Sequence, residues 1–152
     1  RQMCIRDRVK IWRRSYDVRP PFLEIEDDRN PGKLVQYRDV PKEKLPLAES
    51  LKDTAERVNF YFDSAIAVQL KKEKNVLVTA HGNSLRALIM RLEHLTPEQI
   101  LDLNLPTGIP IVYELNQELE VEQRKYLGDP VWIKEKINQV AAQGRKKEAD
   151  YG

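Results

Sequence analysis

Cysteine and histidine are scarce in this sequence. Cys4 is the single cysteine, so neither an intrachain disulfide nor a cysteine metal cluster can form within it. Histidine occurs only at His81 and His94, which leaves too few ligands for a multi-histidine metal site. We therefore expect no metal, and we interpret Cys4, which has no reactive context, as a free thiol.

Long apolar runs and an excess of one charge are absent as well. No run is long enough to span a bilayer, and the first eight residues, RQMCIRDR, lack the apolar core of a signal peptide. The 26 Lys and Arg nearly balance the 24 Asp and Glu, whereas a nucleic-acid binder typically has a clustered basic face. We expect a cytoplasmic protein with neither a membrane nor a nucleic acid as its partner.

The spacing of apolar residues predicts alternating helices and strands. Six prolines and glycines between Asp17 and Leu47 predict a long irregular loop there, either a lid or a surface excursion. Elsewhere we expect, in order, a helix at 9–16, a helix at 50–70, a strand at 76–80, helices from residues 85 and 97, strands at 109–115 and 119–127, and a helix from residue 130. This order is typical of an α/β sheet protein with helices on both faces.

Two helix starts are marked by capping signals. Ser50 and Asp53 form a capping-box pattern, and Thr96 and Gln99 form another. The short β-branched run at 76–80, by contrast, predicts a strand buried on both faces, as in parallel sheets.

The most informative position is His81, where the expected strand ends and a helix begins. Ligands of open α/β sheets bind at this end of strands, and a helix N-terminus favours an anion such as phosphate. Gly82 allows close approach of the backbone, Asn83 and Ser84 can cap the helix or donate to ligand oxygens, and Arg86 follows on the first turn. The imidazole can donate to a phosphoryl oxygen, transfer a proton or be phosphorylated. A structural histidine remains the alternative.

Other candidate residues are weaker on their own. Arg13 and Arg14 can clamp a phosphate or carboxylate with planar, bidentate contacts, although taken alone they are better explained as an ordinary basic helix face. His94 lies near a helix C-terminus, and we interpret it as a capping or surface residue.

Several motifs in one order carry a family resemblance. They are Trp12-Arg13-Arg14, Pro20-Pro21, residues 45–51 (LPLAESL), residues 78–86 (VTAHGNSLR), residues 105–110 (LPTGIP), Tyr113-Glu114 and Tyr126-Leu127-Gly128. From about Val9 to the tail, the sequence resembles the cofactor-dependent (2,3-bisphosphoglycerate-dependent) phosphoglycerate mutases of the histidine phosphatase superfamily.

The resemblance implies a mutase-like three-layer α/β sandwich that is incomplete at its N-terminus. It implies interconversion of 3-phosphoglycerate and 2-phosphoglycerate through a phosphohistidine, with 2,3-bisphosphoglycerate as the priming cofactor. His81 then corresponds to the second active-site histidine, which stabilises the transferring phosphoryl group. Gly82 and Asn83 match substrate- or phosphate-contacting positions, and Arg13 and Arg14 match substrate-binding arginines. Phosphoglycerates are the implied partners, and a homo-oligomer is left open.

The sequence departs from the family at its start. The family nucleophile lies in an Arg-His-Gly motif, which does not occur in these residues. We expect an unrelated lead-in at 1–8, a mutase-like portion at 9–144 and a flexible tail at 145–152. We also expect that this chain alone cannot run the mutase cycle. The strand at 76–80 should lose a neighbour and expose its edge, which lowers stability or favours aggregation.

Two alternatives remain beside the mutase. One is a bisphosphoglycerate mutase or phosphatase of the same superfamily. The other is a non-catalytic module that binds a phosphate ligand through Arg13, Arg14 and the helix start at His81.

Overall fold

The computed structural model describes residues 8, 9, 11, 12 and 15–142. The chain divides into two compact units, Arg1–Thr54 and Ala55–Gly152, and each is treated by itself below. Most of the expected lead-in, the tail at 145–152, Arg13 and Arg14 lie outside the described residues.

The first unit is irregular, as the prolines predict. Arg8, Val9, Ile11 and Trp12 are helical, in agreement with the helix expected near residue 9. Three short 3-10 turns follow within the loop: η1 (Pro31–Lys33), η2 (Val35–Tyr37) and η3 (Lys42–Lys44). No α-helix or strand occurs between residues 17 and 47, all of which are described, so the expected irregular loop is confirmed.

Local hydrogen bonds hold this loop in shape. Asn30 is buried, and its side chain donates to the Glu24 carbonyl at 3.2 Å while it accepts from the Gly32 amide at 2.9 Å. The amide of Leu23 donates to the Leu47 carbonyl at 3.1 Å and so ties the two ends of the loop. The loop therefore has a defined path without regular secondary structure.

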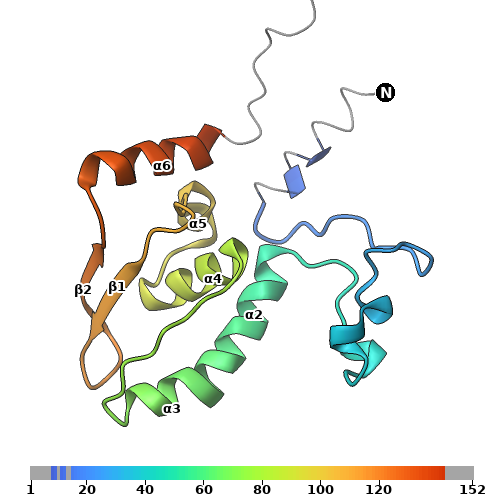
Figure 1. The fold of residues 1–152 in the computed structure, drawn as a ribbon, viewed down its shortest axis with the longest axis horizontal. Helices are drawn as coiled ribbons and strands as arrows, with labels where there is room; N and C mark the ends of the chain where they lie inside the picture. Colours follow the sequence, from blue (N-terminus) through green and yellow to red (C-terminus); the bar gives the residue numbers. More distant parts are fainter. Residues whose placement is uncertain (1–7, 10, 13–14, 143–152) are drawn as a thin grey trace, which may run out of the picture. The chain divides into compact units, whose positions relative to one another are not determined.

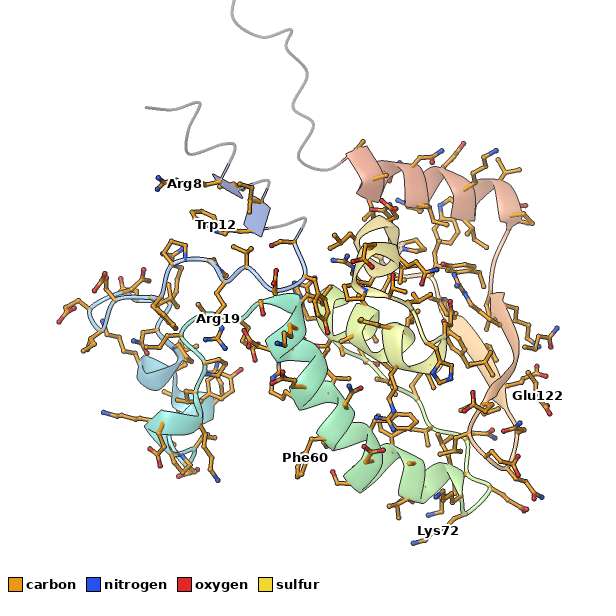
Figure 2. The ribbon with its side chains drawn as sticks, turned by 180° about the vertical axis from the view of Figure 1, so that it is seen from behind. Arg8, Trp12, Arg19, Phe60, Lys72 and Glu122 are labelled. Carbon is orange, nitrogen blue, oxygen red and sulfur yellow. The ribbon has the colours of Figure 1, made fainter. Side chains whose placement is uncertain are left out.

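Helix α2 (Leu51–Tyr61) begins at the predicted capping box. The Asp53 amide donates to Ser50 Oγ at 3.2 Å, and the Ser50 amide donates to Asp53 Oδ2 at 2.8 Å, so both members of the box are satisfied. Arg19 donates to both oxygens of Asp53 at 2.6 Å, and Figure 2 shows its side chain beside the start of this helix. Two residues, Ser50 in the same turn and Arg19 from 34 positions earlier in the chain, therefore fix the Asp53 carboxylate.

The helix continues through a π-helical turn, η4 (Phe62–Ile66), into α3 (Ala67–Leu70). Ser64 Oγ donates to the Phe60 carbonyl at 2.8 Å, an alternative to regular helical hydrogen bonding that such turns tolerate. A turn at residues 71–73 ends the element, in agreement with the helix expected at 50–70. Phe62 is buried, whereas Phe60 projects into solvent with 76% of its surface exposed (Figure 2).

The expected strand at 76–80 is not formed. In Figure 1 this segment runs as a plain trace from α3 to α4, and Leu77 is 91% exposed. No backbone group of residues 75–80 makes a hydrogen bond with any described residue. A strand exists only with a neighbour to complete its ladder, so the apolar sequence does not suffice here. The prediction of a strand buried on both faces is wrong, and the expected exposure of this segment is confirmed.

The remaining elements of the second unit follow the predicted order. They are α4 (Gly82–Leu92), α5 (Pro97–Asp102), β1 (Ile111–Leu115), β2 (Val121–Tyr126) and α6 (Pro130–Ala142). Strands β1 and β2 pair antiparallel, with Ile111 opposite Tyr126 and an irregularity between Glu114 and Leu115. They form the one sheet among the described residues.

Helix α4 is joined to elements on two sides within this unit, as Figure 1 lets the reader follow. Arg91 near its end makes a bidentate ion pair with Asp63 of η4, with nitrogen–oxygen distances of 2.6 and 3.3 Å. Glu93, which caps its C-terminus, accepts from Tyr113 of β1 at 2.5 Å and from Arg124 of β2 at 2.9 Å.

The apolar core lies among these elements. Its buried side chains are Ala55, Phe62, Ala67, Ala87, Ile89, Ile100, Ile109 and Ile133. Ile100 is completely buried, so the short helix α5 is anchored firmly despite its length.

Candidate functional site

His81 is the N-cap residue of α4. Its backbone is extended, and its ring Nδ1 accepts a hydrogen bond from the Asn83 amide at 3.3 Å. The sequence left open whether Asn83 and Ser84 cap this helix or donate to ligand oxygens. The structure assigns the capping hydrogen bond to the histidine instead, because its ring folds back over the first turn.

This hydrogen bond assigns the ring proton of the neutral imidazole. Because Nδ1 is the acceptor, its lone pair is occupied, and the proton belongs on Nε2. The side chain of His81 is exposed, so this Nε2–H can reach a ligand. The imidazole is therefore oriented as a hydrogen-bond donor at the start of a helix.

The first turn of α4 adds further donors and no negative charge. Neither Asp nor Glu occurs in this turn, so no carboxylate there repels an anionic ligand. The amides of Gly82 and Ser84 lack intrahelical acceptors because of their position in the first turn, and the helix dipole places partial positive charge there. Such a helix start suits an anionic oxygen.

Gly82 leaves open space in this turn. A Cβ built on it would meet no atom within 4 Å, and its backbone conformation is one that any residue adopts. Neither packing nor strain within the described residues calls for glycine here. The sequence interpretation, in which glycine lets the backbone approach a ligand, therefore stays a prediction.

Arg86 connects this turn to the core. One guanidinium nitrogen, Nη2, donates to the Ile100 carbonyl of α5 at 2.5 Å, and Nη1 lies 3.5 Å from Asn83 Oδ1. The sequence placed Arg86 on the same helix but gave no signal for its contact with α5, which is 14 residues away in the chain.

The structure thus brings together three of the predicted site residues, His81, Gly82 and Asn83, at the start of α4. The other two, Arg13 and Arg14, fall on residues outside those described. His94 lies at the far end of α4, exposed, with Nε2 2.9 Å from Glu120 Oε2, which confirms a surface position.

A polar cluster that the sequence did not reveal lies at the other end of the same helix. It consists of Glu93, Tyr113, Arg124 and Tyr126. Burial, followed by the hydrogen bond to Glu93, raises the pKa of Tyr113 well above its ordinary value. The 11 residues of α4 separate this cluster from His81 by roughly 16 Å along the helix axis. We interpret it as a structural link between the helix and the sheet.

Within residues 8–9, 11–12 and 15–142, no group of three or more His, Cys, Asp or Glu side chains is arranged to hold a metal ion. The same residues include no helix with the length and apolar character needed to cross a membrane.

Comparison with known proteins identifies the family. Residues 21–124 match the model of the histidine phosphatase superfamily (branch 1). The chain belongs to this superfamily. The α/β fold class that the motifs implied is thereby supported, although the described residues contain only its helices and a two-stranded sheet.

Curated relatives carry a more specific name. Proteins named 2,3-bisphosphoglycerate-dependent phosphoglycerate mutase match at 54% identity in Lachnoclostridium phytofermentans, 51% in Treponema denticola and 50% in Borreliella burgdorferi. The matches cover 91 to 93% of this chain but only 56 to 57% of each relative. The chain therefore spans a little over half the length of the curated relatives it matches.

Proposed function

We propose that this chain forms the part of a 2,3-bisphosphoglycerate-dependent phosphoglycerate mutase that holds the phosphoryl group during its transfer between 3-phosphoglycerate and 2-phosphoglycerate. The observation that carries the proposal is the orientation of His81, whose Nδ1 is occupied by the Asn83 amide and whose Nε2–H is exposed at a helix start. Relatives at 50 to 54% identity with this name support the reaction class.

The donors at this helix start suit a phosphoryl group. Negative charge spreads over the three equatorial oxygens of a transferring phosphoryl group, so catalysis depends on positioned donors and positive potential. His81 Nε2–H, the first-turn amides and the Asn83 side chain provide donors from one rigid turn. The absence of an acidic residue in that turn removes a source of repulsion.

The cofactor fits the same donor set. 2,3-Bisphosphoglycerate, when bound, supplies the phosphoryl group that primes the enzyme. Its phosphates require N–H donors, which the first turn of α4 offers, and no metal ligand. We further propose that Arg13 and Arg14 bind the carboxylate or phosphate of phosphoglycerate through bidentate contacts. We also propose that the protein acts in the cytoplasm, where soluble phosphoglycerate is available.

The nucleophile is not among these residues. The Arg-His-Gly motif that the resemblance requires does not occur in the sequence. We therefore propose that His81 stabilises a phosphoryl group which a different histidine receives, and that residues 1–152 on their own bind phosphoglycerate without turnover.

The proposal is tested by combining this chain with the part of a relative that the chain does not cover. The purified chain is mixed with, or fused to, the part of the Lachnoclostridium phytofermentans relative that lies outside the match, and phosphoglycerate interconversion is measured. We expect activity from the combination and none from either part alone. A variant with His81→Asn in the combination should lose activity by about 100-fold or more, the scale found when one transition-state donor is removed.

Two results would contradict the proposal. Turnover or a phosphorylated histidine in the 152-residue chain alone would mean that His81 is itself a nucleophile. Binding of 3-phosphoglycerate with no activity in any combination would favour a non-catalytic phosphate-binding module.

A further inference from the structure

Arg86 occupies an unusual position for a cation. It is near the N-terminus of α4, where the helix dipole disfavours positive charge, and its side chain is partly buried. Helical side chains point back toward the N-terminus, so its guanidinium lies over the first turn rather than away from it. A cation kept at this end raises the positive potential around the His81 helix start.

The guanidinium is anchored in the core. Nη2 donates to the carbonyl of Ile100 at 2.5 Å, and Ile100 is completely buried. Helix α5, which carries Ile100, is fixed in turn by its capping box, in which the Gln99 amide donates to Thr96 Oγ1 at 3.3 Å and the Thr96 amide donates to Gln99 Oε1 at 2.8 Å. The position of the Arg86 fork is therefore set by the backbone of α5 at its one buried residue, Ile100.

The other arm of the fork reaches Asn83. Nη1 is 3.5 Å from Asn83 Oδ1, at the outer limit of a hydrogen bond, and a cation at this distance still attracts the carbonyl oxygen. The attraction determines which way the amide points. With Oδ1 turned toward Arg86, Nδ2 is the end of the side chain that can donate to a ligand oxygen.

We propose that Arg86 is a positioning residue that holds the Asn83 amide with Nδ2 facing the ligand, an inference that rests on the proposed function of this helix start. Arg86 acts through Asn83 and makes no contact with the reacting atoms in this role. A lysine cannot replace it, because an ammonium lacks the planar fork that reaches Ile100 and Asn83 at the same time.

The experiment compares two arginines of the same helix. In the 152-residue chain, Arg86→Lys, Asn83→Ala and the double variant are titrated with 3-phosphoglycerate. Arg91→Lys is the matched control, since Arg91 also makes a two-armed contact, to Asp63, but lies at the other end of α4. The loss of one well-aligned donor corresponds to a weakening of about tenfold in affinity.

We expect Arg86→Lys and Asn83→Ala each to weaken 3-phosphoglycerate binding by about tenfold, and the double variant to be no weaker than Asn83→Ala. Arg91→Lys should lower the melting temperature without changing the affinity. Multiplicative losses in the double variant, or an equal loss of affinity in Arg91→Lys, would overturn the positioning role.

A measurement without ligand separates this inference from the proposed function. The side-chain NH₂ resonances of Asn83 should shift in Arg86→Lys and stay unchanged in Arg91→Lys. If the unsubstituted chain does not bind 3-phosphoglycerate, the proposed function fails, while these resonances still decide the positioning role. Unchanged Asn83 resonances in Arg86→Lys overturn it whatever the affinity.

Discussion

The substitution His81→Asn separates the capping role of His81, which the structure shows, from its proposed role in ligand binding. Asparagine is among the preferred N-cap residues, whereas histidine is not, and the present capping bond of 3.3 Å is long for an amide donor. His81 is exposed, so the substitution removes little packing. We expect helix α4 to gain about 0.5 to 1 kcal/mol, which corresponds to a rise in melting temperature of roughly 1 to 3 °C for a chain of this size.

The same substitution should weaken ligand binding. A shorter amide that folds over the first turn cannot place a donor where the Nε2–H of the imidazole lies. The loss of one hydrogen bond to a charged oxygen is worth about 1.5 to 3 kcal/mol, or roughly 10- to 150-fold in affinity for 3-phosphoglycerate. Circular dichroism melting and calorimetric titration of the same samples measure both effects.

His81→Ala is the matched control, because it removes the cap and the donor together and should lower both stability and affinity. The reasoning fails if His81→Asn melts several degrees lower while its affinity is unchanged. That outcome would make His81 a structural cap with no part in ligand binding.

Three further predictions follow from the same geometry. Gly82→Ala should leave the free energy of unfolding unchanged or raise it slightly, by about 0.5 kcal/mol, because the added Cβ meets no atom within 4 Å. Weakened 3-phosphoglycerate binding in this variant would support close approach of the backbone to the ligand, and unchanged binding would exclude it. The Arg19 guanidinium, followed by donors from Ser50, holds the pKa of Asp53 well below its ordinary 3.8. The stability that this carboxylate contributes is therefore complete above pH 3.8 and is lost as the pH falls through the folded pKa. Thermal melts at acid pH should show a smaller loss of stability in Asp53→Asn than in the unsubstituted protein, and an identical loss would contradict the linkage. Leu77→Lys should change the free energy of unfolding by less than about 0.5 kcal/mol, since Leu77 is 91% exposed. It should also reduce self-association, measured by light scattering. Equal association of the variant and the unsubstituted protein would mean that residues 75–80 are not the segment through which the chains associate.

Features that depend on near neighbours in the chain were predictable. The capping boxes at Ser50 and Thr96 join residues three apart, and both are present with the expected partners. Two more contacts are equally local: the Leu119 amide donates to the Asn116 carbonyl in the turn between β1 and β2, and Asp129 Oδ1 accepts from the Val131 and Trp132 amides at the start of α6. Spacing alone encodes such bonds, because the acceptor and donor come within reach as soon as the backbone turns.

Features that depend on distant partners were not predictable. The contact of Arg86 with Ile100 joins residues 14 apart, and that of Arg124 with Glu93 joins residues 31 apart. The segment at 76–80 is the clearest case, since its apolar, β-branched sequence is that of a strand, yet it has no hydrogen-bonded neighbour among the described residues. A strand is a property of a pair, so one sequence segment cannot decide it.

The sequence by itself therefore determined the capped starts of α2 and α5, the irregular loop and the family, and it singled out His81, Gly82 and Asn83. Tertiary structure decided how Arg86 links the helix start to the core, and it left residues 76–80 without a hydrogen-bonded neighbour among the described residues. The physical reason is that propensity and capping act over a few residues, whereas the orientation of a donor depends on groups that only folding brings together.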